Sequence, residues 1–353
     1  MHLRKKQNMK NNPYTLLFGK KPTQIINRIV EENIVLDAFT SDTPSQQVFV
    51  ITGVRGSGKT VFLTEIAKKL STDNSWIIVE LNPERNMLES LVSKLGSEMP
   101  LAKFFKSAKI NLSFFGVGLE VKGEVPITDV ETALSKMISS LKNHNKRLLI
   151  TIDEAVNTAN MREFVSAYQI FVRQDLPVFL LMTGLYDHID NLQNEKNLTF
   201  LHRAPKIELQ PLNLGTIAEN YLKNFEIDPD TAHSMALLTK GYSFAFQVLG
   251  YFTWENTGTD DSIMTPYRQY LEDYVYDKIW SELSFNDKKV LYGIAKTQTG
   301  KISEIRDFIG IETNQFNPYR KRLIRKGLIK GDSYGYVSLT LPLFDKFILE
   351  NYE

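Results

Sequence analysis

The feature that most constrains the fold of this chain is a regular alternation of short apolar runs with longer helical stretches. The apolar runs are rich in β-forming residues and occupy residues 46–52, 76–81, 147–153, 177–183 and 206–210. Strands that are apolar along their whole length belong to parallel sheets with helices on both faces. We therefore expect an α/β fold with a doubly wound parallel sheet.

The stretch 109–124 interrupts this alternation. Its apolar and polar residues alternate about Gly116 and Gly118. Alternation around a glycine turn is typical of a β-hairpin. We expect a hairpin inserted between the second and third sheet strands, where its simplest role is to cover an edge of the sheet.

The pattern changes after the last predicted strand, and a chain of 353 residues has room for more than one domain. Residues 213–283 show helical periodicity without β-rich runs, which predicts a helical lid. Residues 284–353 predict three helices and a glycine-turned hairpin, the outline of a winged helix-turn-helix. The predicted order is an N-terminal arm at 1–25, a sheet core at 26–212, the lid and the winged helix.

A phosphate-binding signature follows the first predicted strand. Residues 53–60 read Gly-Val-Arg-Gly-Ser-Gly-Lys-Thr, and a helical run begins directly after them. In such a loop, backbone N–H groups and the helix N-terminus bind phosphate oxygens, Lys59 reaches the β- and γ-phosphates, and Thr60 places its hydroxyl on Mg²⁺. The predicted nucleotide-binding residues here are Gly53, Arg55, Gly56, Ser57, Gly58, Lys59 and Thr60.

Two consecutive carboxylates end the third predicted strand. Asp153 can hold Mg²⁺ together with Thr60, and Glu154 can act as general base toward an attacking water. The alternative is that both residues cap the following helix. The run 145–148 lacks the acid of a guanine-specific element, so ATP is the expected nucleotide. The predicted fold class is an α/β P-loop NTPase core with a helical lid and a C-terminal winged helix-turn-helix.

Composition excludes several other classes. The chain has no cysteine and its five histidines lack the spacing of metal ligands, so disulfides, thiol catalysis and a zinc site are not expected. No apolar run approaches the roughly 20 residues of a spanning helix. The first residues carry cations without a following apolar segment, so we expect a cytoplasmic protein with no membrane partner.

These motifs together resemble the AAA+ ATPases, in particular the branch shared by origin-recognition initiators and prokaryotic ATPases that end in a winged helix. The resemblance spans most of the chain and includes Asn12-Pro13-Tyr14, Phe18-Gly19, Pro22, Asn27-Arg28, residues 179–184, residues 201–212 and Lys240-Gly241-Tyr242.

The resemblance implies roles for three further residues. Arg28 would border the adenine, and Thr183 would occupy the first sensor position near the γ-phosphate. Arg203 would be an arginine finger acting on a neighbouring subunit, which implies a homo-oligomer. The alternative for Arg203 is an ordinary surface arginine beside an edge strand.

The start of the lid departs from the family pattern. Gly241-Tyr242-Ser243-Phe244 contains no arginine where many AAA+ members have a second sensor. This resembles the STAND-type signalling ATPases, although Ser243 replaces the proline of their Gly-x-Pro turn. We therefore expect slow, switch-like hydrolysis.

The third helix of the winged module is rich in cations, which favours contact with double-stranded DNA. The module from residue 281 carries twelve cationic and nine acidic side chains, a net charge of +3. The leading hypothesis is an ATPase that couples Mg-ATP to DNA, in replication, mobile-element maintenance or transposition. The alternative is a STAND-like regulatory or defence switch whose winged helix contacts protein, and a metabolic phosphotransferase would leave the basic helix without a role. The predicted DNA contacts are Arg320, Lys321, Arg322, Arg325 and Lys326.

Overall fold

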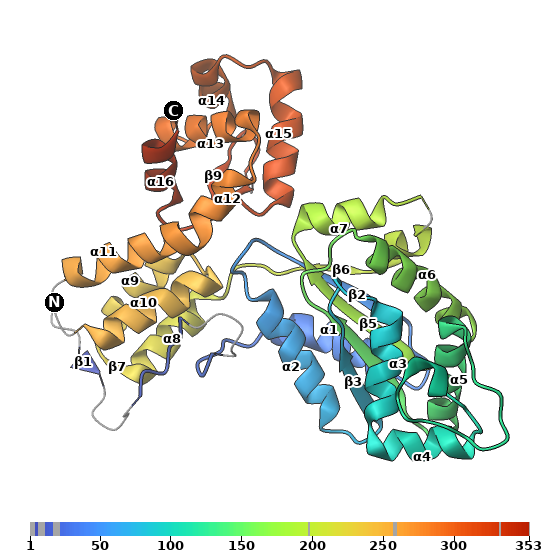
Figure 1. The fold of residues 1–353 in the computed structure, drawn as a ribbon. Coiled ribbons are helices and arrows are strands. Elements are labelled where there is room, and N and C mark those ends of the chain that lie inside the picture. The colour runs from blue at the N-terminus through green and yellow to red at the C-terminus, as the bar shows by residue number, and fades with distance from the viewer. Residues whose placement is uncertain are drawn as a thin grey trace. The chain divides into compact units, whose positions relative to one another are not determined.

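The computed structural model describes residues 4–5, 11–16, 22–196, 198–256, 260–331 and 333–352 (Figure 1). By its internal contacts the chain forms two compact units. The sheet unit contains Arg28–Thr52 and Lys59–Glu208. The helical unit contains Met1–Asn27, Gly53–Gly58 and Leu209–Glu353, so the chain passes from one unit to the other several times.

A parallel five-stranded sheet forms the centre of the sheet unit, in the order β3, β4, β5, β2, β6. Its strands are β2 (Val48–Thr52), β3 (Trp76–Glu80), β4 (Arg147–Ile152), β5 (Val178–Gly184) and β6 (Lys206–Glu208). Every neighbouring pair is parallel. The predicted strands and the α/β fold class are confirmed, and the carboxyl ends of all five strands lie at one edge of the sheet.

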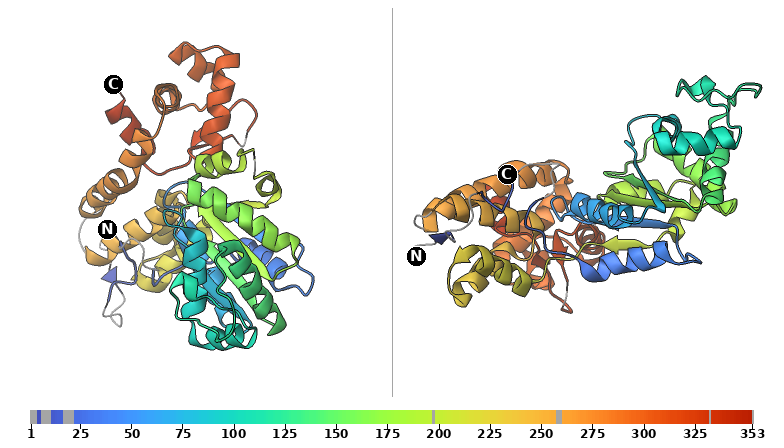
Figure 2. Two further views of the ribbon diagram at one scale, coloured as in Figure 1. Left: turned by 45° about the vertical axis from the view of Figure 1, so that its right-hand side comes forward. Right: turned by 90° about the horizontal axis from the view of Figure 1, so that it is seen from below.

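Helices cover both faces of this sheet (Figure 2). The helices of this unit are α1 (Ile29–Thr40), α2 (Lys59–Ser71), α3 (Met87–Ser97), α4 (Met99–Ser107), α5 (Val130–Asn143), α6 (Ala159–Arg173) and α7 (Tyr186–Gln193). Helix α4 packs on α3 and α5. Leu148 and Ile150 of β4 share one apolar cluster with α3, α5 and α6. On α1, Phe39 meets Phe49 and Phe179 at ring-centroid distances of 5.5 and 5.1 Å. The two apolar faces explain why the strands are apolar at successive positions.

The hairpin predicted at 109–124 is wrong. These residues are all described, and they form a compact loop that contains the short 3₁₀ helix η1 (Ser113–Phe115) and no strand. The buried side chain of Asn111 organises the loop: its Nδ2 donates to the carbonyl oxygen of Glu124 at 2.7 Å, and its Oδ1 accepts from the Ser113 N–H at 3.1 Å. A side-chain amide therefore pairs backbone groups that a β-ladder would otherwise use.

The helical unit begins with a group of lid helices. They are α8 (Leu214–Asn224), α9 (Pro229–Thr239), α10 (Ser243–Glu255), α11 (Asp260–Leu271), the π-helical segment η3 (Glu272–Tyr276) and α12 (Asp277–Ser281). Asn213 and Asp228 cap α8 and α9, because each side chain accepts a backbone N–H from the first turn of its helix. The helical character predicted for this region is confirmed.

Tyr14 anchors the N-terminal segment onto the lid helices. Its ring is 2% exposed, its hydroxyl donates to Asn220 Oδ1 at 2.9 Å, and Asn224 Nδ2 donates to the hydroxyl at 3.1 Å. A Cβ atom at Gly250 would lie 2.5 Å from this ring, so glycine is needed there for close packing. The N-terminal segment is therefore part of the lid core.

Other parts of the arm are described only in part. Arg4–Lys5 (β1) pairs antiparallel with β7 (Phe225–Glu226). Phe18 and Gly19, which contribute to the family resemblance, lie outside the described residues.

The C-terminal module contains the elements predicted for it, in the predicted order. They are α13 (Phe285–Thr297), α14 (Ile302–Ile309), α15 (Thr313–Arg325), the antiparallel pair β8 (Ile329–Lys330) and β9 (Ser338–Leu339), and a further helix, α16 (Phe344–Asn351). Phe316 and Leu323 of α15 are fully buried, which fixes the face of this helix that is turned to the core. Among the described residues, no helix has both the length and the apolar character needed to cross a membrane.

The role of Asn111 gives a first prediction. We expect Asn111→Ala to lower the free energy of unfolding by about 2 kcal/mol, because the part-buried carbonyl of Glu124 and the N–H of Ser113 both lose the partner that the buried amide supplies. Urea denaturation measures this change. Asn143→Ala, at an exposed asparagine of α5, is the control and should stay within about 0.5 kcal/mol of the parent. Equal losses in the two variants would contradict the assigned role.

Candidate nucleotide site

The phosphate-loop residues adopt the backbone that their glycines allow. Gly56 and Gly58 have φ angles of 76° and 92°, in a region that residues with a Cβ rarely adopt. The loop turns back on itself, since the Ser57 N–H donates to the carbonyl oxygen of Val54 at 3.1 Å. Loop residues 53–58 belong to the helical unit, whereas Lys59 and Thr60 open α2 in the sheet unit.

The start of α10 binds the outside of this loop through three consecutive residues. The Tyr242 hydroxyl donates to the Arg55 carbonyl oxygen at 2.6 Å. The Phe244 N–H donates to the Gly56 carbonyl oxygen at 3.1 Å, and Ser243 Oγ donates to the Ser57 carbonyl oxygen at 3.0 Å. From the sequence, only the lack of an arginine at these positions was predicted, and the contact with the loop was not.

Within the sheet unit, Asp153 brings together residues from three elements. Thr60 Oγ1 of α2 donates to Asp153 Oδ2 at 2.7 Å. The Thr183 hydroxyl of β5 donates to Asp153 Oδ1 and accepts the Glu154 N–H at 3.2 Å. Thr183 is completely buried, whereas Glu154 is exposed. Four of the predicted residues therefore form one hydrogen-bonded network.

The network follows from the order of the strands. β5 lies between β2 and β4, and in the parallel register Thr183 lies beside Ile51, while Ile152 lies beside Met182. Thr183 therefore stands next to the position that follows β4, which is Asp153. The Glu154 backbone has a φ of 53°, in the left-handed region, so the chain turns sharply after the acid pair.

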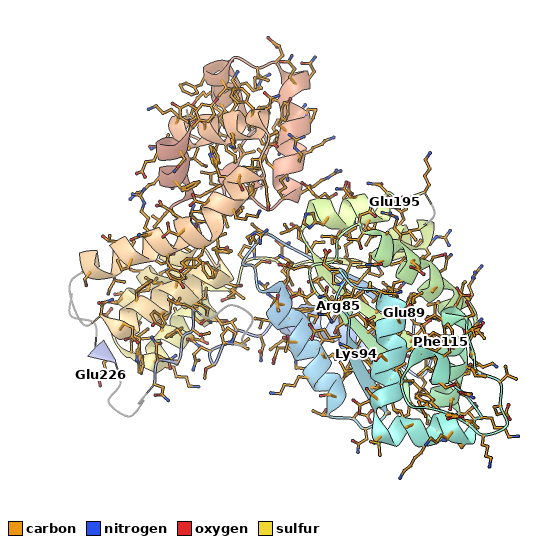
Figure 3. All side chains as sticks on the ribbon, viewed as in Figure 1. Arg85, Glu89, Lys94, Phe115, Glu195 and Glu226 are labelled. Atoms are coloured by element: carbon orange, nitrogen blue, oxygen red, sulfur yellow. The ribbon has the colours of Figure 1, made fainter. Side chains whose placement is uncertain are left out.

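The alternative role of the acid pair, capping the next helix, does not hold. Helix α6 begins at Ala159, and its N-cap is Thr158, whose side chain accepts the Met161 N–H. The linker to this helix is fixed separately: Asn157 Nδ2 donates to Glu195 Oε1 at 2.8 Å, and Figure 3 labels Glu195 beyond α7. The two carboxylates are therefore not used by α6.

The donor set suits a magnesium ion that is also bound by phosphate. Mg²⁺ prefers oxygen ligands and usually retains water and phosphate oxygens in its shell. Thr60 Oγ1 and Asp153 Oδ2 are adjacent hard oxygen ligands. Within the described ranges, no group of three or more His, Asp or Glu residues could hold a metal by itself. A cation at Thr60 and Asp153 would thus depend on the nucleotide.

Two predicted arginines lie in different surroundings. Arg28 is half-buried at the N-cap of α1, and burial lowers the pKa of its guanidinium, a shift that Glu31 partly opposes. The backbone N–H of Arg28 donates to Glu32 Oε1 at 3.3 Å. Arg203 is exposed at the end of the 3₁₀ helix η2 (Thr199–Arg203). Neither residue belongs to the Asp153 network.

The predicted DNA residues of α15 divide into two groups. Lys321 and Arg325 are exposed, whereas Arg320, Arg322 and Lys326 are partly buried.

Arg322 has a structural role in addition to its charge. Its Nη2 lies 2.7 Å from Oδ1 of the buried Asp287 and 3.0 Å from Ser284 Oγ. Arg320 lies against the turn after β8, since a Cβ at Gly331 would come within 2.5 Å of its Nη2. Arg322 therefore links α15 to α13, and its contact with DNA stays a prediction.

Comparisons with known proteins agree with this geometry. Residues 26–201 match the family model described as "ATPase domain predominantly from Archaea", and residues 273–348 match a domain of unknown function. A search of the curated proteins gave no match.

Solved structures show the same fold at low sequence identity. The Walker-type ATPase PABY2304 of Pyrococcus abyssi is similar with a TM-score of 0.65 and 15% identity, over 95% of this chain and 99% of that chain. The ORC2 protein of Aeropyrum pernix, in its ADPNP–ADP complexes, is similar with a TM-score of 0.58 and 15% identity, over 94% of each chain.

These comparisons define the fold as that of a P-loop ATPase similar to an archaeal Walker-type ATPase and an ORC2 protein, and the match to an ATPase-domain family covers residues 26–201.

The Asp153 network gives a second prediction. Thr183→Val keeps the shape of the side chain but removes the hydroxyl that orients Asp153 and Glu154. We expect ATP turnover to fall about tenfold, because Asp153 and Glu154 lose the bonds that hold them in place. Steady-state phosphate release measures it.

The matched control is Thr151→Val, at a buried threonine of the neighbouring strand β4. It should turn over ATP within about twofold of the parent, since Thr151 is outside the network. A Thr183 variant as active as this control would show that the hydroxyl does not matter.

Proposed function

We propose that the protein is a slow ATPase switch that binds Mg-ATP through residues 53–60. The observation that carries this proposal is the network in which Asp153 accepts hydrogen bonds from Thr60 and Thr183. The ADPNP–ADP complexes of the similar ORC2 protein support an adenine nucleotide as the ligand. Lys59 would bind the β- and γ-phosphates, and Arg28 would border the adenine.

Each residue of the network has a separate task in the proposed reaction. Thr60 and Asp153 would hold Mg²⁺, which when bound neutralises charge on the phosphates. Glu154 is exposed at a sharp turn and would take the proton of the water that attacks the γ-phosphate. Thr183 donates to Asp153 and accepts from the Glu154 backbone, so one hydroxyl positions both acids.

Slow turnover follows from the lack of a cationic side chain at the start of the lid, residues 241–244. A cation directed at the γ-phosphate stabilises the charge that develops in phosphoryl transfer. Residues 241–244 provide no arginine, and Tyr242 and Ser243 use their hydroxyls on loop carbonyl groups. The exposed Arg203 would supply the missing charge only to a neighbouring subunit of a homo-oligomer.

The nucleotide proposal is tested by two variants at different steps. Mg-ATP at 100 times its Kd should stabilise the parent by about 2.7 kcal/mol and raise its melting midpoint. Lys59→Ala should abolish this rise, because the phosphates lose their cation. Glu154→Gln should keep the rise and lose about 100-fold in turnover, because only the base is removed.

Differential scanning fluorimetry and phosphate release together separate binding from chemistry. Parental protein whose midpoint does not change with Mg-ATP would refute nucleotide binding. A Glu154→Gln variant with parental turnover would refute the assigned base.

We further propose that the C-terminal module is a winged helix whose α15 lies against double-stranded DNA. Lys321 and Arg325 are exposed on this helix and would contact phosphates, and Asn314 and Gln315 are exposed at its start. A protein partner, as in the STAND-like alternative, is favoured by large apolar side chains exposed on this module, among them two phenylalanines. The two phenylalanines are Phe285 at 67% and Phe308 at 49%.

A salt titration distinguishes the two partners. Lys321→Gln with Arg325→Gln should weaken duplex DNA binding and reduce the slope of log K against log salt concentration by about 1.8, because two phosphate contacts are lost. Fluorescence anisotropy with a labelled duplex measures both quantities.

The control makes the same charge change on the sheet unit, by Lys103→Gln with Lys106→Gln on the exposed side of α4. If both double variants give the parental slope, α15 is not a DNA-binding helix, and a protein partner becomes the better hypothesis.

A further inference from the structure

Three consecutive residues at the start of α10 meet three consecutive carbonyl groups of the phosphate loop. The Tyr242 hydroxyl donates to the Arg55 carbonyl oxygen and the Phe244 N–H to that of Gly56. The Ser243 hydroxyl donates to the carbonyl oxygen of Ser57. These contacts lie inside the helical unit. We call residues 242–244 the loop clamp.

The clamp determines which way the loop's N–H groups point. Across a trans peptide, the carbonyl of one residue and the N–H of the next point in opposite directions, and the described chain has no cis peptide. Donors on the carbonyls of residues 55–57 therefore direct the N–H groups of residues 56–58 to the opposite side of the loop. The Ser57 N–H points to the inner side of the loop but donates to the Val54 carbonyl oxygen at 3.1 Å, so the clamp acts on phosphate binding through the N–H groups of Gly56 and Gly58.

The clamp also explains why Gly56 has to be glycine beyond its φ angle. A Cβ there would lie 2.2 Å from the Tyr242 hydroxyl oxygen and 3.0 Å from Phe244 Cβ. The lid helix is therefore packed directly on the loop. Burial raises the pKa of the Tyr242 hydroxyl, so this group stays protonated and remains a donor.

A second contact connects the loop to the end of the lid. Arg55 Nη2 lies 3.3 Å from Glu282 Oε1, just after α12. Since Arg55 is about one-third exposed, this ion pair adds little energy by itself. The clamp supplies three hydrogen bonds between the loop and the lid beside this ion pair.

We infer that Tyr242 is a positioning residue for nucleotide binding: through the clamp it holds the loop N–H groups in the direction that phosphate oxygens require. This inference rests on the proposed function, because it assigns part of the affinity for ATP to the lid. By linkage, a nucleotide that fixes the loop also stabilises the clamp. The start of the lid therefore acts on the loop rather than on the nucleotide.

The test compares two Tyr→Phe variants that each lose one buried hydroxyl in the helical unit. Tyr242→Phe removes the bond to the Arg55 carbonyl, and Tyr221→Phe removes an equivalent bond to the Phe246 carbonyl at 2.9 Å, inside the lid core. We expect Tyr242→Phe to raise the KM for ATP and the Kd of a slowly hydrolysed ATP analogue with magnesium about tenfold. Its kcat should stay within about twofold, because ground state and transition state lose the same contact.

Tyr221→Phe should leave KM and Kd within about twofold of the parent, even if both variants melt at lower temperature. Equal KM values for the two variants would overturn the inference. If Tyr242→Phe does not fold, Ser243→Ala gives the same test through the Ser57 carbonyl. Its control is Ser281→Ala, which loses a hydroxyl bond to the Lys278 carbonyl.

The two proposals fail differently. Parental protein that binds no ATP analogue refutes the nucleotide function and the clamp's role with it. Parental protein that binds the analogue, together with a Tyr242 or Ser243 variant that binds it equally well, refutes only the clamp.

Discussion

The order of the strands in the sheet is the constraint on which the candidate site depends. Because β5 lies between β2 and β4, a residue near the carboxyl end of β5 is flanked by the ends of both neighbours. Thr183 occupies this place, and its single hydroxyl contacts Asp153 and the backbone of Glu154. The buried, apolar strands fix this register, since a slip of one residue would turn each side chain to the other face. Packing of the core therefore positions the acids.

Most of the fold was predictable because it depends on local pattern. Hydrophobic periodicity is enough to predict apolar strands separated by helices. The glycine-rich loop between β2 and α2 can be predicted from its residue spacing. The Asp153 site was also predictable from local pattern, because the sequence shows both where β4 ends and where the phosphate loop lies.

Features that depend on distant side chains were not predictable in this way. Asn111 converts an alternating stretch into a compact loop, because its amide pairs with a backbone carbonyl thirteen residues later. Arg322 looks like one cation among several, yet the buried Asp287, 35 residues before it, makes it a structural residue. The loop clamp joins residues separated by 186 or more positions. No pattern of period or spacing carries such information, since each pairing exists only after the chain has folded.

The clamp and the absent arginine have a common physical consequence. An arginine on the γ-phosphate interacts most strongly when negative charge develops in the transition state, and so raises kcat. Neutral donors on the outer carbonyls of the loop orient its N–H groups equally in ground and transition states. Such uniform binding raises affinity without accelerating the chemical step. A lid that holds the loop in this way would favour long occupancy by ATP over rapid turnover, as the proposed switch requires.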